Sequence, residues 1–259
     1  MTPVARIGLF PYLNVQPLVF GLRTQPGLEI VVDLPSRIAE RFRAGELDAA
    51  MVPSLEAADL DASVLDSVCI ASEGPVETVL LHHRVGLESV RTLALDEASR
   101  TSAALAKILI ADASGRLPEC SEIRADEAGT IEADAVLLIG DPAASFSRPG
   151  FAALDLGEVW QRSRSLPFVF AVIVLGPRAI DLKIGKTVLD ALERGLDHAP
   201  TIARSYNSGM DPHRAERYLR QVIRYRFGDQ EKKGLALFYR LAMARGLMVK
   251  AKELQFHAA

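Results

Sequence analysis

Several polar residues of this chain follow apolar runs directly, where a folded protein can present them to a ligand. Asn14 follows the run 6–10 and precedes Pro17, so we expect it on a tight turn. Its side-chain amide can donate a hydrogen bond to one oxygen and accept one from a hydroxyl at the same time. This chemistry would suit contact with a polar ligand, and the alternative is an Asx turn that only shapes the chain.

Hydroxyl residues stand at two expected helix starts. Ser54 follows the apolar run 47–52, and a turn after residue 95 carries Ser99, Thr101 and Ser102. The free N–H groups and the dipole of a helix N-terminus bind anions, and hydroxyl side chains add further donors. The alternative is simple helix capping, for which Ser and Thr are preferred.

Asp141 is the best-placed carboxylate, directly after the apolar run 133–139 and Gly140. It could be a general base, a helix N-cap or a hydrogen-bond partner between lobes. Two aromatic residues, Tyr12 and Phe168, could line a pocket or fill the core. The histidines do not show metal-ligand spacing, so we expect neither a metal site nor a catalytic histidine.

Alternating strands and helices must position these residues. Apolar runs at 6–10, 28–34, 47–52 and 64–71 alternate with segments of helical period, of which 36–44 is the clearest. This pattern predicts a mostly parallel sheet with helices packed on it. Further strands are expected at 76–82, 93–95, 133–139 and 168–175, with a helix from residue 99 to about 111. After residue 177 we expect helices only, including 214–224 and 230–244.

Two of the expected strands, near 79–81 and 169–174, flank a self-contained strand and helix block. If both cross between lobes, that block is an inserted lobe. The prediction is a two-lobed α/β protein, with 1–85 and 177–259 in the first lobe and 86–176 in the second. This layout is similar to type II periplasmic-binding-protein folds, in which the ligand lies between the lobes near strand ends and helix N-termini.

Composition argues against several classes of partner. The 259 residues carry a formal charge of −3, whereas a polyanion-binding protein is usually basic. The basic C-terminal segment 211–259 has aromatic residues at helical spacing, which favours a packed helix face over RNA binding. No run of 18 apolar residues is present, so we expect no membrane span. Cys69 and Cys120 lack metal spacing and are expected to be buried, in a cytoplasmic protein whose first residues resemble a strand rather than a leader.

Six motifs follow one another in order between residue 6 and about residue 175. They are Tyr-Leu-Asn and Pro-Leu within 12–18, Val-Pro-Ser-Leu-Glu at 52–56, Ser-Glu-Gly-Pro-Val at 72–76, Thr101-Ser102, the segment 133–141, and the segment 155–171. In this order they resemble the chorismate dehydratase family of the futalosine-type menaquinone pathway. The chain departs from the family at Ala57, where Tyr is usual, at Thr78, where Ser is frequent, and at Arg164-Ser165, where Thr-Gly precedes Leu-Pro-Phe.

The resemblance implies that chorismate loses water to give 3-[(1-carboxyvinyl)oxy]benzoate. The ring becomes aromatic, so the reaction is downhill and no cofactor is expected. Two catalytic residues are implied, Asn14 and Asp141. The implied substrate-binding residues are Tyr12, Ser54, Ser72, Gly74, Thr78, Ser99, Thr101, Ser102 and Phe168. A further hypothesis is that the enolpyruvyl carboxylate of the substrate takes the ring proton itself while the protein supplies geometry and polar stabilisation.

Three other functions compete with this interpretation. A small-carboxylate binding protein is the usual use of the fold, but its exported form predicts a signal peptide or a lipoprotein cysteine. A ligand-sensing regulator would need a DNA-binding module, for which 259 residues leave no room beside two lobes. The later dihydroxynaphthoate-forming enzyme of the same pathway fits Tyr12-Leu13-Asn14 less well. The sequence predicts no oligomeric state, and a monomer and a homodimer both stay open.

Overall fold

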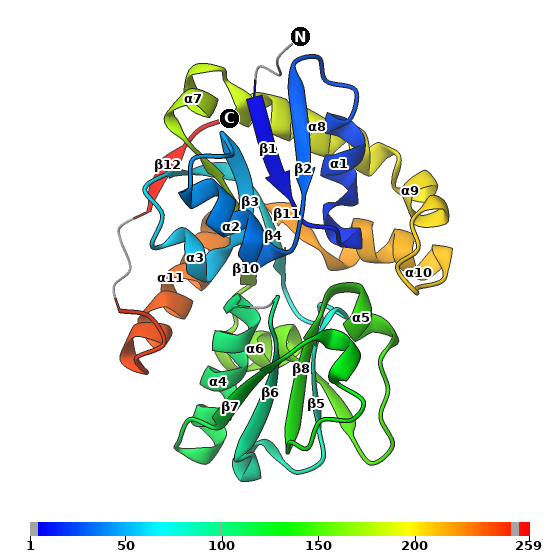
Figure 1. The fold of residues 1–259 in the computed structure, drawn as a ribbon, viewed down its shortest axis with the longest axis vertical. Helices are drawn as coiled ribbons and strands as arrows, with labels where there is room; N and C mark the ends of the chain where they lie inside the picture. Colours follow the sequence, from blue (N-terminus) through cyan, green and yellow to red (C-terminus); the bar gives the residue numbers. More distant parts are fainter. Residues whose placement is uncertain (1–4, 99, 250–253) are drawn as a thin grey trace.

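Two α/β lobes lie one above the other in the computed structural model, which describes residues 5–98, 100–249 and 254–259 (Figure 1). The first lobe contains the strands β1 (Ala5–Leu9), β2 (Leu28–Val32), β3 (Ala49–Pro53), β4 (Ser63–Ser72), β10 (Phe168–Leu175), β11 (Arg224–Arg226) and β12 (Gln255–His257). Their order in the sheet is β11-β4-β10-β3-β1-β2, and β12 pairs with β4. β1 is parallel to β2 and β3, while β10 is antiparallel to β3 and β4.

Helices cover this sheet in two groups. The first group follows the early strands: a 3-10 turn η1 (Leu13–Val15), α1 (Gln16–Leu22), α2 (Pro35–Arg43) and α3 (Ser54–Ala57). The second group follows β10: α7 (Pro177–Asp181), α8 (Ile184–Asp197), α9 (Ala199–Ser205), α10 (Pro212–Arg217), a π-helical turn η4 (Tyr218–Val222) and α11 (Asp229–Ala244). α2 shows why such segments fold, because Pro35 occupies its first turn and Ile38 and Phe42 share its buried face.

The second lobe is an independent five-stranded sheet. Its strands are β5 (Val79–His83), β6 (Thr92–Asp96), β7 (Glu119–Ile123), β8 (Ala135–Ile139) and β9 (Ala152–Asp155), in the order β7-β6-β8-β5-β9. Its helical segments are η2 (Leu87–Ser89), α4 (Arg100–Ser114), η3 (Ala125–Glu127), α5 (Gly140–Ser145) and α6 (Leu156–Arg164). β8 is buried along its whole length, between β6, to which it is parallel, and β5, to which it is antiparallel.

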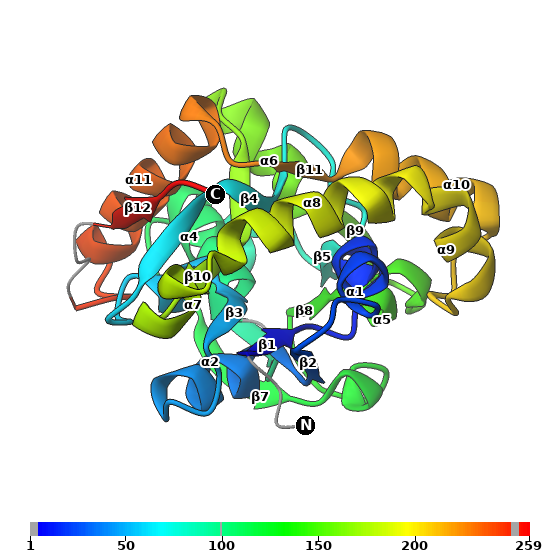
Figure 2. The same cartoon turned by 90° about the horizontal axis from the view of Figure 1, so that it is seen from above.

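The first helix is fixed against α8 by an unusually close backbone contact (Figure 2). A Cβ added at Gly21 would lie 2.0 Å from the carbonyl oxygen of Ala191, and one added at Gly195 would lie 1.9 Å from that of Pro17. Both positions therefore require glycine. The contact fixes the start of α1, immediately after Asn14.

Three expectations about the fold need correction. β5 pairs in the second sheet and β10 in the first, so sheet membership crosses the predicted boundaries at 85 and 176. Two strands, β11 and β12, follow residue 177, and each is a three-residue segment held by the edge of β4. Cys120 is exposed because β7 is an edge strand, whereas Cys69 is buried as expected. None of the helices among the described residues is long and apolar enough to cross a membrane.

Candidate active site

A cavity of about 530 Å³, counted with its open mouth, lies between the two lobes. Both lobes supply its walls, through the residues Phe10, Tyr12, Asn14, Pro35, Pro53, Ile70, Val76, Thr78, Val79, Ala98, Arg100, Thr101, Ser102, Ile139, Gly140, Phe170 and Ala171.

The parallel strands explain why helix starts converge on the cavity. β1, β3, β6 and β8 each end at the interface between the lobes, and the next helical segment begins there (Figure 1). Pro53 precedes α3, Arg100 opens α4 and Gly140 opens α5, and all three residues line the cavity. Strand ends and helix N-termini make this edge of an α/β sheet a natural site for an anionic ligand.

Arg100 is the one charged side chain among the described lining residues. Its Nε lies 2.9 Å from a carboxylate oxygen of Glu56, which is buried in the first lobe. Arg43 contacts the other oxygen of Glu56 at 3.0 Å. The cavity wall therefore carries a cation of the second lobe that is paired across the interface.

Asn14 presents an unsatisfied acceptor at the cavity. Its side-chain oxygen Oδ1 is buried and has no hydrogen-bond partner. Its main-chain carbonyl accepts a bond of 2.9 Å from the hydroxyl of Tyr225, which fixes the backbone at this position. A buried acceptor without a partner costs free energy, so a ligand hydroxyl that donated to it would be stabilised.

The start of α4 brings two predicted residues to the cavity. Thr101 and Ser102 both line it and are both buried. Thr101 Oγ1 accepts a bond of 3.0 Å from the main-chain N–H of Leu55, so this hydroxyl also joins the two lobes. Ser99, the third predicted residue of this turn, lies outside the described residues.

Tyr12 lines the cavity beneath the start of α5. Gly140 packs against its ring so closely that an added Cβ would lie 2.6 Å from Tyr12 Cδ1. Burial raises the pKa of the Tyr12 hydroxyl, and the carboxylates of Asp96 and Asp141 raise it further. The phenol is therefore neutral and can donate a hydrogen bond.

Asp141 connects the lobes and does not line the cavity. One carboxylate oxygen accepts a bond of 3.3 Å from the main-chain N–H of Leu13, and the other accepts one of 2.8 Å from the hydroxyl of Tyr206. Burial raises the pKa of Asp141, and these two donors oppose the increase. Of the three roles considered for this residue, the contacts favour the hydrogen-bond partner between lobes.

Four predicted binding residues are not brought to the cavity. The buried hydroxyls of Ser54 and Ser72 donate to the main-chain carbonyls of Val169 and Gly74, at 2.7 and 3.0 Å. Gly74 has a φ of 113° and shapes the turn that leads to the second lobe. Phe168 packs in an aromatic cluster of the core, whose members are Trp160, Phe170 and Phe238.

Three residues near the site were not predicted. Phe170 lines the cavity in the place expected for Phe168. Side chains alternate between the two faces of a strand, so residues 168 and 170 lie on the same face and the pattern cannot distinguish them. Arg100 stands directly before Thr101, and a positive charge at an expected helix start could have indicated from the sequence that this residue contacts an anionic ligand. Tyr218 contacts Thr78 at 2.8 Å across 140 residues of sequence, for which no local signal exists.

The histidines contribute nothing to the cavity wall. His82 is buried against Phe146, with ring centres 4.7 Å apart, and His83 contacts the carbonyl of Val85. Among residues 5–98, 100–249 and 254–259, no group of three or more His, Cys, Asp or Glu side chains is placed to hold a metal ion.

Comparisons with known proteins agree with this architecture. The sequence model of a family described as menaquinone biosynthesis matches residues 5–244. A chorismate dehydratase of Thermus thermophilus is 29% identical over 257 residues, which cover 90% of this chain and 93% of that protein.

Two solved structures show the same fold. Protein AF1704 of Archaeoglobus fulgidus has a TM-score of 0.76 at 18% identity, covering 94% of this chain and 98% of its own. The alkanesulfonate-binding protein SsuA of Xanthomonas axonopodis pv. citri has a TM-score of 0.67 at 16% identity, with both chains covered completely. The two-lobed periplasmic-binding-protein-like fold expected from the sequence is thereby confirmed.

Proposed function

Because the chain belongs to the menaquinone biosynthesis family, we propose that it removes water from chorismate to give 3-[(1-carboxyvinyl)oxy]benzoate. The observation that carries the proposal is the 29% identity with a chorismate dehydratase along 90% of the chain. The cavity between the lobes adds support, since its described wall has a single charge, the cation of Arg100, which suits an anionic substrate.

The substrate carboxylates would be held by the start of α4. Its first N–H groups, the hydroxyls of Thr101 and Ser102 and the guanidinium of Arg100 are all donors on one side of the cavity. Arg100 is already paired with Glu56, so a substrate carboxylate would compete with that pair or share the guanidinium. The aromatic rings of Tyr12 and Phe170 would flank the ring of the substrate.

Asn14 would orient the hydroxyl that leaves. Its free Oδ1 is an acceptor for the hydrogen of the ring hydroxyl, and the hydroxyl of Thr78 lies on the same wall as a donor. The elimination removes hydroxide from one ring carbon and a proton from the neighbouring carbon that bears the ether. These leave together as water and the ring becomes aromatic, so no redox or group-transfer cofactor is required.

The proton acceptor in this proposal is the enolpyruvyl carboxylate of the substrate. The described wall of the cavity contains no Asp, Glu or His side chain, and both oxygens of Asp141 are engaged elsewhere. The protein would then act by orientation and polar stabilisation. Asp141→Asn separates the two mechanisms, because abolished turnover with intact substrate binding would favour Asp141 as the base.

The direct test is to mix purified protein with chorismate and follow it by chromatography with mass detection. A product lighter by one water, formed without added metal or nucleotide, would support the proposal. Unchanged chorismate that nevertheless raises the melting temperature would favour a binding protein, and the absence of both effects would remove chorismate as the ligand. We also propose a cytoplasmic location, which is supported by two cysteines present as free thiols.

A further inference from the structure

One buried hydroxyl connects two residues of the cavity wall that are far apart in sequence. The side chain of Tyr218 is 1% exposed, and its hydroxyl lies 2.8 Å from Oγ1 of Thr78. The side chain of Asn14 lies beside the same hydroxyl, where it opposes the rise in the pKa of Tyr218 that burial causes. Both partners line the cavity, and Tyr218 itself lies behind the wall.

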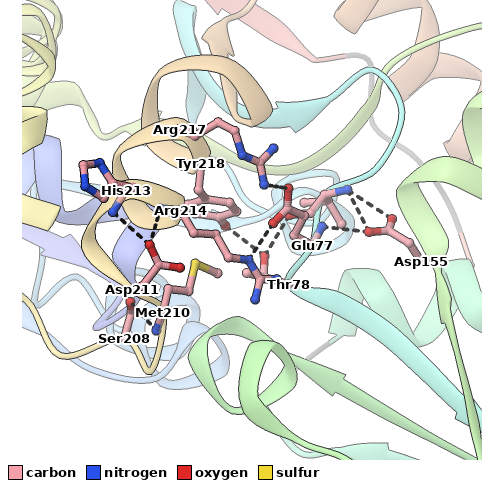
Figure 3. Close-up of polar contacts among 11 residues, drawn as sticks. Glu77, Thr78, Asp155, Ser208, Met210, Asp211, His213, Arg214, Arg217 and Tyr218 are labelled. Atoms are coloured by element: carbon pink, nitrogen blue, oxygen red, sulfur yellow. Dashed lines mark hydrogen bonds and ion pairs between the residues drawn. The ribbon is translucent and has the colours of Figure 1, made fainter.

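The position of Tyr218 is set by an irregular turn. It is the first residue of η4, the π-helical turn that continues α10. Single π-helical turns are rare and are frequent at functional sites, because the extra residue re-aims the side chains that follow. The hydroxyl of Tyr218 reaches the lobe crossover from this turn, as Figure 3 shows for its contact with Thr78.

The same helix also holds the residue before Thr78. Arg214 Nε and Arg217 Nη2 contact the two carboxylate oxygens of Glu77 at 3.0 and 2.5 Å (Figure 3). Glu77 has a φ of 65°, in the left-handed region that a side chain adopts only when its surroundings hold it there. One helix face carries all three contacts, because Arg217 and Tyr218 follow Arg214 by three and four residues. This face holds residues 77 and 78 together.

We propose that Tyr218 is a positioning residue whose phenol orients the Asn14 amide and the Thr78 hydroxyl toward the substrate. This inference rests on the dehydration proposed above. The Asn14 amide nitrogen would then donate to the phenol oxygen, and its buried, unpaired Oδ1 would be left as the free acceptor. The phenol in turn would donate to Thr78 Oγ1, whose own hydrogen makes a long contact of 3.5 Å with the main-chain carbonyl of Val76 and could turn from it to a ligand oxygen. The wall then presents one acceptor and one donor in a fixed arrangement.

Other buried tyrosines of the chain show the contrast. The hydroxyl of Tyr225 donates to the main-chain carbonyl of Asn14, and that of Tyr239 donates to the main-chain carbonyl of Ser54 at 2.6 Å. The bonds of Tyr225 and Tyr239 therefore hold the main chain in place. The bonds of Tyr218 hold side chains whose amide and hydroxyl could otherwise rotate. Tyr239 is therefore a matched control for the loss of a buried phenol hydroxyl.

The test compares Tyr218→Phe with Tyr239→Phe in two measurements. The chain has two asparagines, Asn14 and Asn207, so asparagine labelled with 15N in its side chain gives two amide signals. We expect Tyr218→Phe to shift the Asn14 signal and to lower kcat about tenfold or more, because misplaced groups in a site cost this much or more. Tyr239→Phe is expected to leave the Asn14 signal and kcat unchanged while lowering the melting temperature similarly.

An Asn14 signal that is unchanged in Tyr218→Phe overturns the inference, and so does a kcat no lower than that of Tyr239→Phe. If the unmodified protein does not convert chorismate, the proposed function fails, and the Asn14 signal alone then decides on Tyr218. Should Tyr218→Phe not fold, Thr78→Val removes the other end of the same chain of hydrogen bonds at nearly constant volume. It must shift the Asn14 signal for the inference to stand.

Discussion

Asp155 ties the second lobe to the segment that carries Thr78, and its replacement by asparagine tests how that segment is held. Oδ1 of Asp155 accepts from the N–H groups of Gly157 and Glu158, at 3.0 and 3.1 Å, and so caps α6. Oδ2 accepts from the N–H groups of Val76 and Glu77, at 3.0 and 2.7 Å. One carboxylate thus serves a helix and the crossover between the lobes (Figure 3).

Asparagine preserves the volume and caps a helix as well as aspartate does, so the cap on α6 should survive. The amide nitrogen of the new side chain would then face the two N–H groups of the crossover, donor against donor. Hydrogen bonds to a charged group contribute roughly 1.5–3 kcal/mol each. Val76 is buried, but Glu77 is partly exposed and water can replace its partner. We therefore expect Asp155→Asn to lower the free energy of unfolding by about 2–4 kcal/mol.

The assay is thermal unfolding followed by steady-state kinetics with chorismate. For a chain of this size the loss corresponds to a melting temperature lower by about 5–15 °C, and kcat should fall because Thr78 shifts with the crossover. Asp211→Asn is the matched control, since Asp211 caps α10 through the N–H groups of His213 and Arg214 at an exposed position. Equal melting temperatures for the two variants would refute the reasoning.

Three further predictions concern packing and protonation. Gly140→Ala should reduce kcat/KM, because the added methyl group would displace the ring of Tyr12 in the cavity wall. Gly150 has a similar positive φ but open space around it, so Gly150→Ala should lower only the stability, by about 1–2 kcal/mol. Thermal unfolding and steady-state kinetics check both variants. Phe168→Leu should lower the free energy of unfolding by about 1–3 kcal/mol and leave KM unchanged, because Phe168 packs in the core. Phe170→Leu should raise KM, because Phe170 lines the cavity. The reverse result would place Phe168 at the substrate. Burial lowers the pKa of His82 from its ordinary value of 6.5, so the unfolded state binds the proton more tightly and stability falls as pH drops below about 6.5. His82→Phe should flatten that slope in urea titrations by at most about 1.4 kcal/mol per pH unit, and an unchanged slope would exclude His82 as its source.

The elements with strong periodicity could be predicted from the sequence because burial on one or both faces dictates their residue types. Residues 168–175 form β10 at the expected bounds, and the helices predicted at 36–44 and 230–244 correspond to α2 and α11. β7 has four exposed residues out of five, so it leaves no apolar run to detect. β11 and β12 form because backbone groups of β4 are available to pair with them. This pairing depends on the folded arrangement of distant segments and leaves no local pattern in the sequence.

The candidate site was predictable as far as it depends on strand ends and helix starts. Asn14, Thr101 and Ser102 follow strands whose ends meet at the interface, and all three line the cavity. The choice between Phe168 and Phe170 was not predictable, because both lie on one face of β10 and only the packing of Trp160 against Phe168 separates them. Pattern alone could not assign the partners of Asp141 and Thr78, since Tyr206 and Tyr218 lie 65 and 140 residues away in the sequence.

The contacts across the interface give two motif residues a role besides contact with the substrate. Asp141 joins α5 to Leu13 and Tyr206 of the first lobe, and Thr101 joins α4 to Leu55. Each of these bonds is made by a side chain at or beside the wall, so the wall is complete only while the lobes are together. A substrate-assisted elimination needs such a wall more than it needs a base, because its rate depends on holding the ring hydroxyl and the carboxylate in one geometry. A residue that joins the lobes can therefore be as necessary to turnover as one that touches the substrate. Asp141→Asn would then lower kcat without abolishing turnover and would also weaken substrate binding, through the position of Leu13 and its neighbour Asn14, whereas abolished turnover with intact binding is expected only of a base.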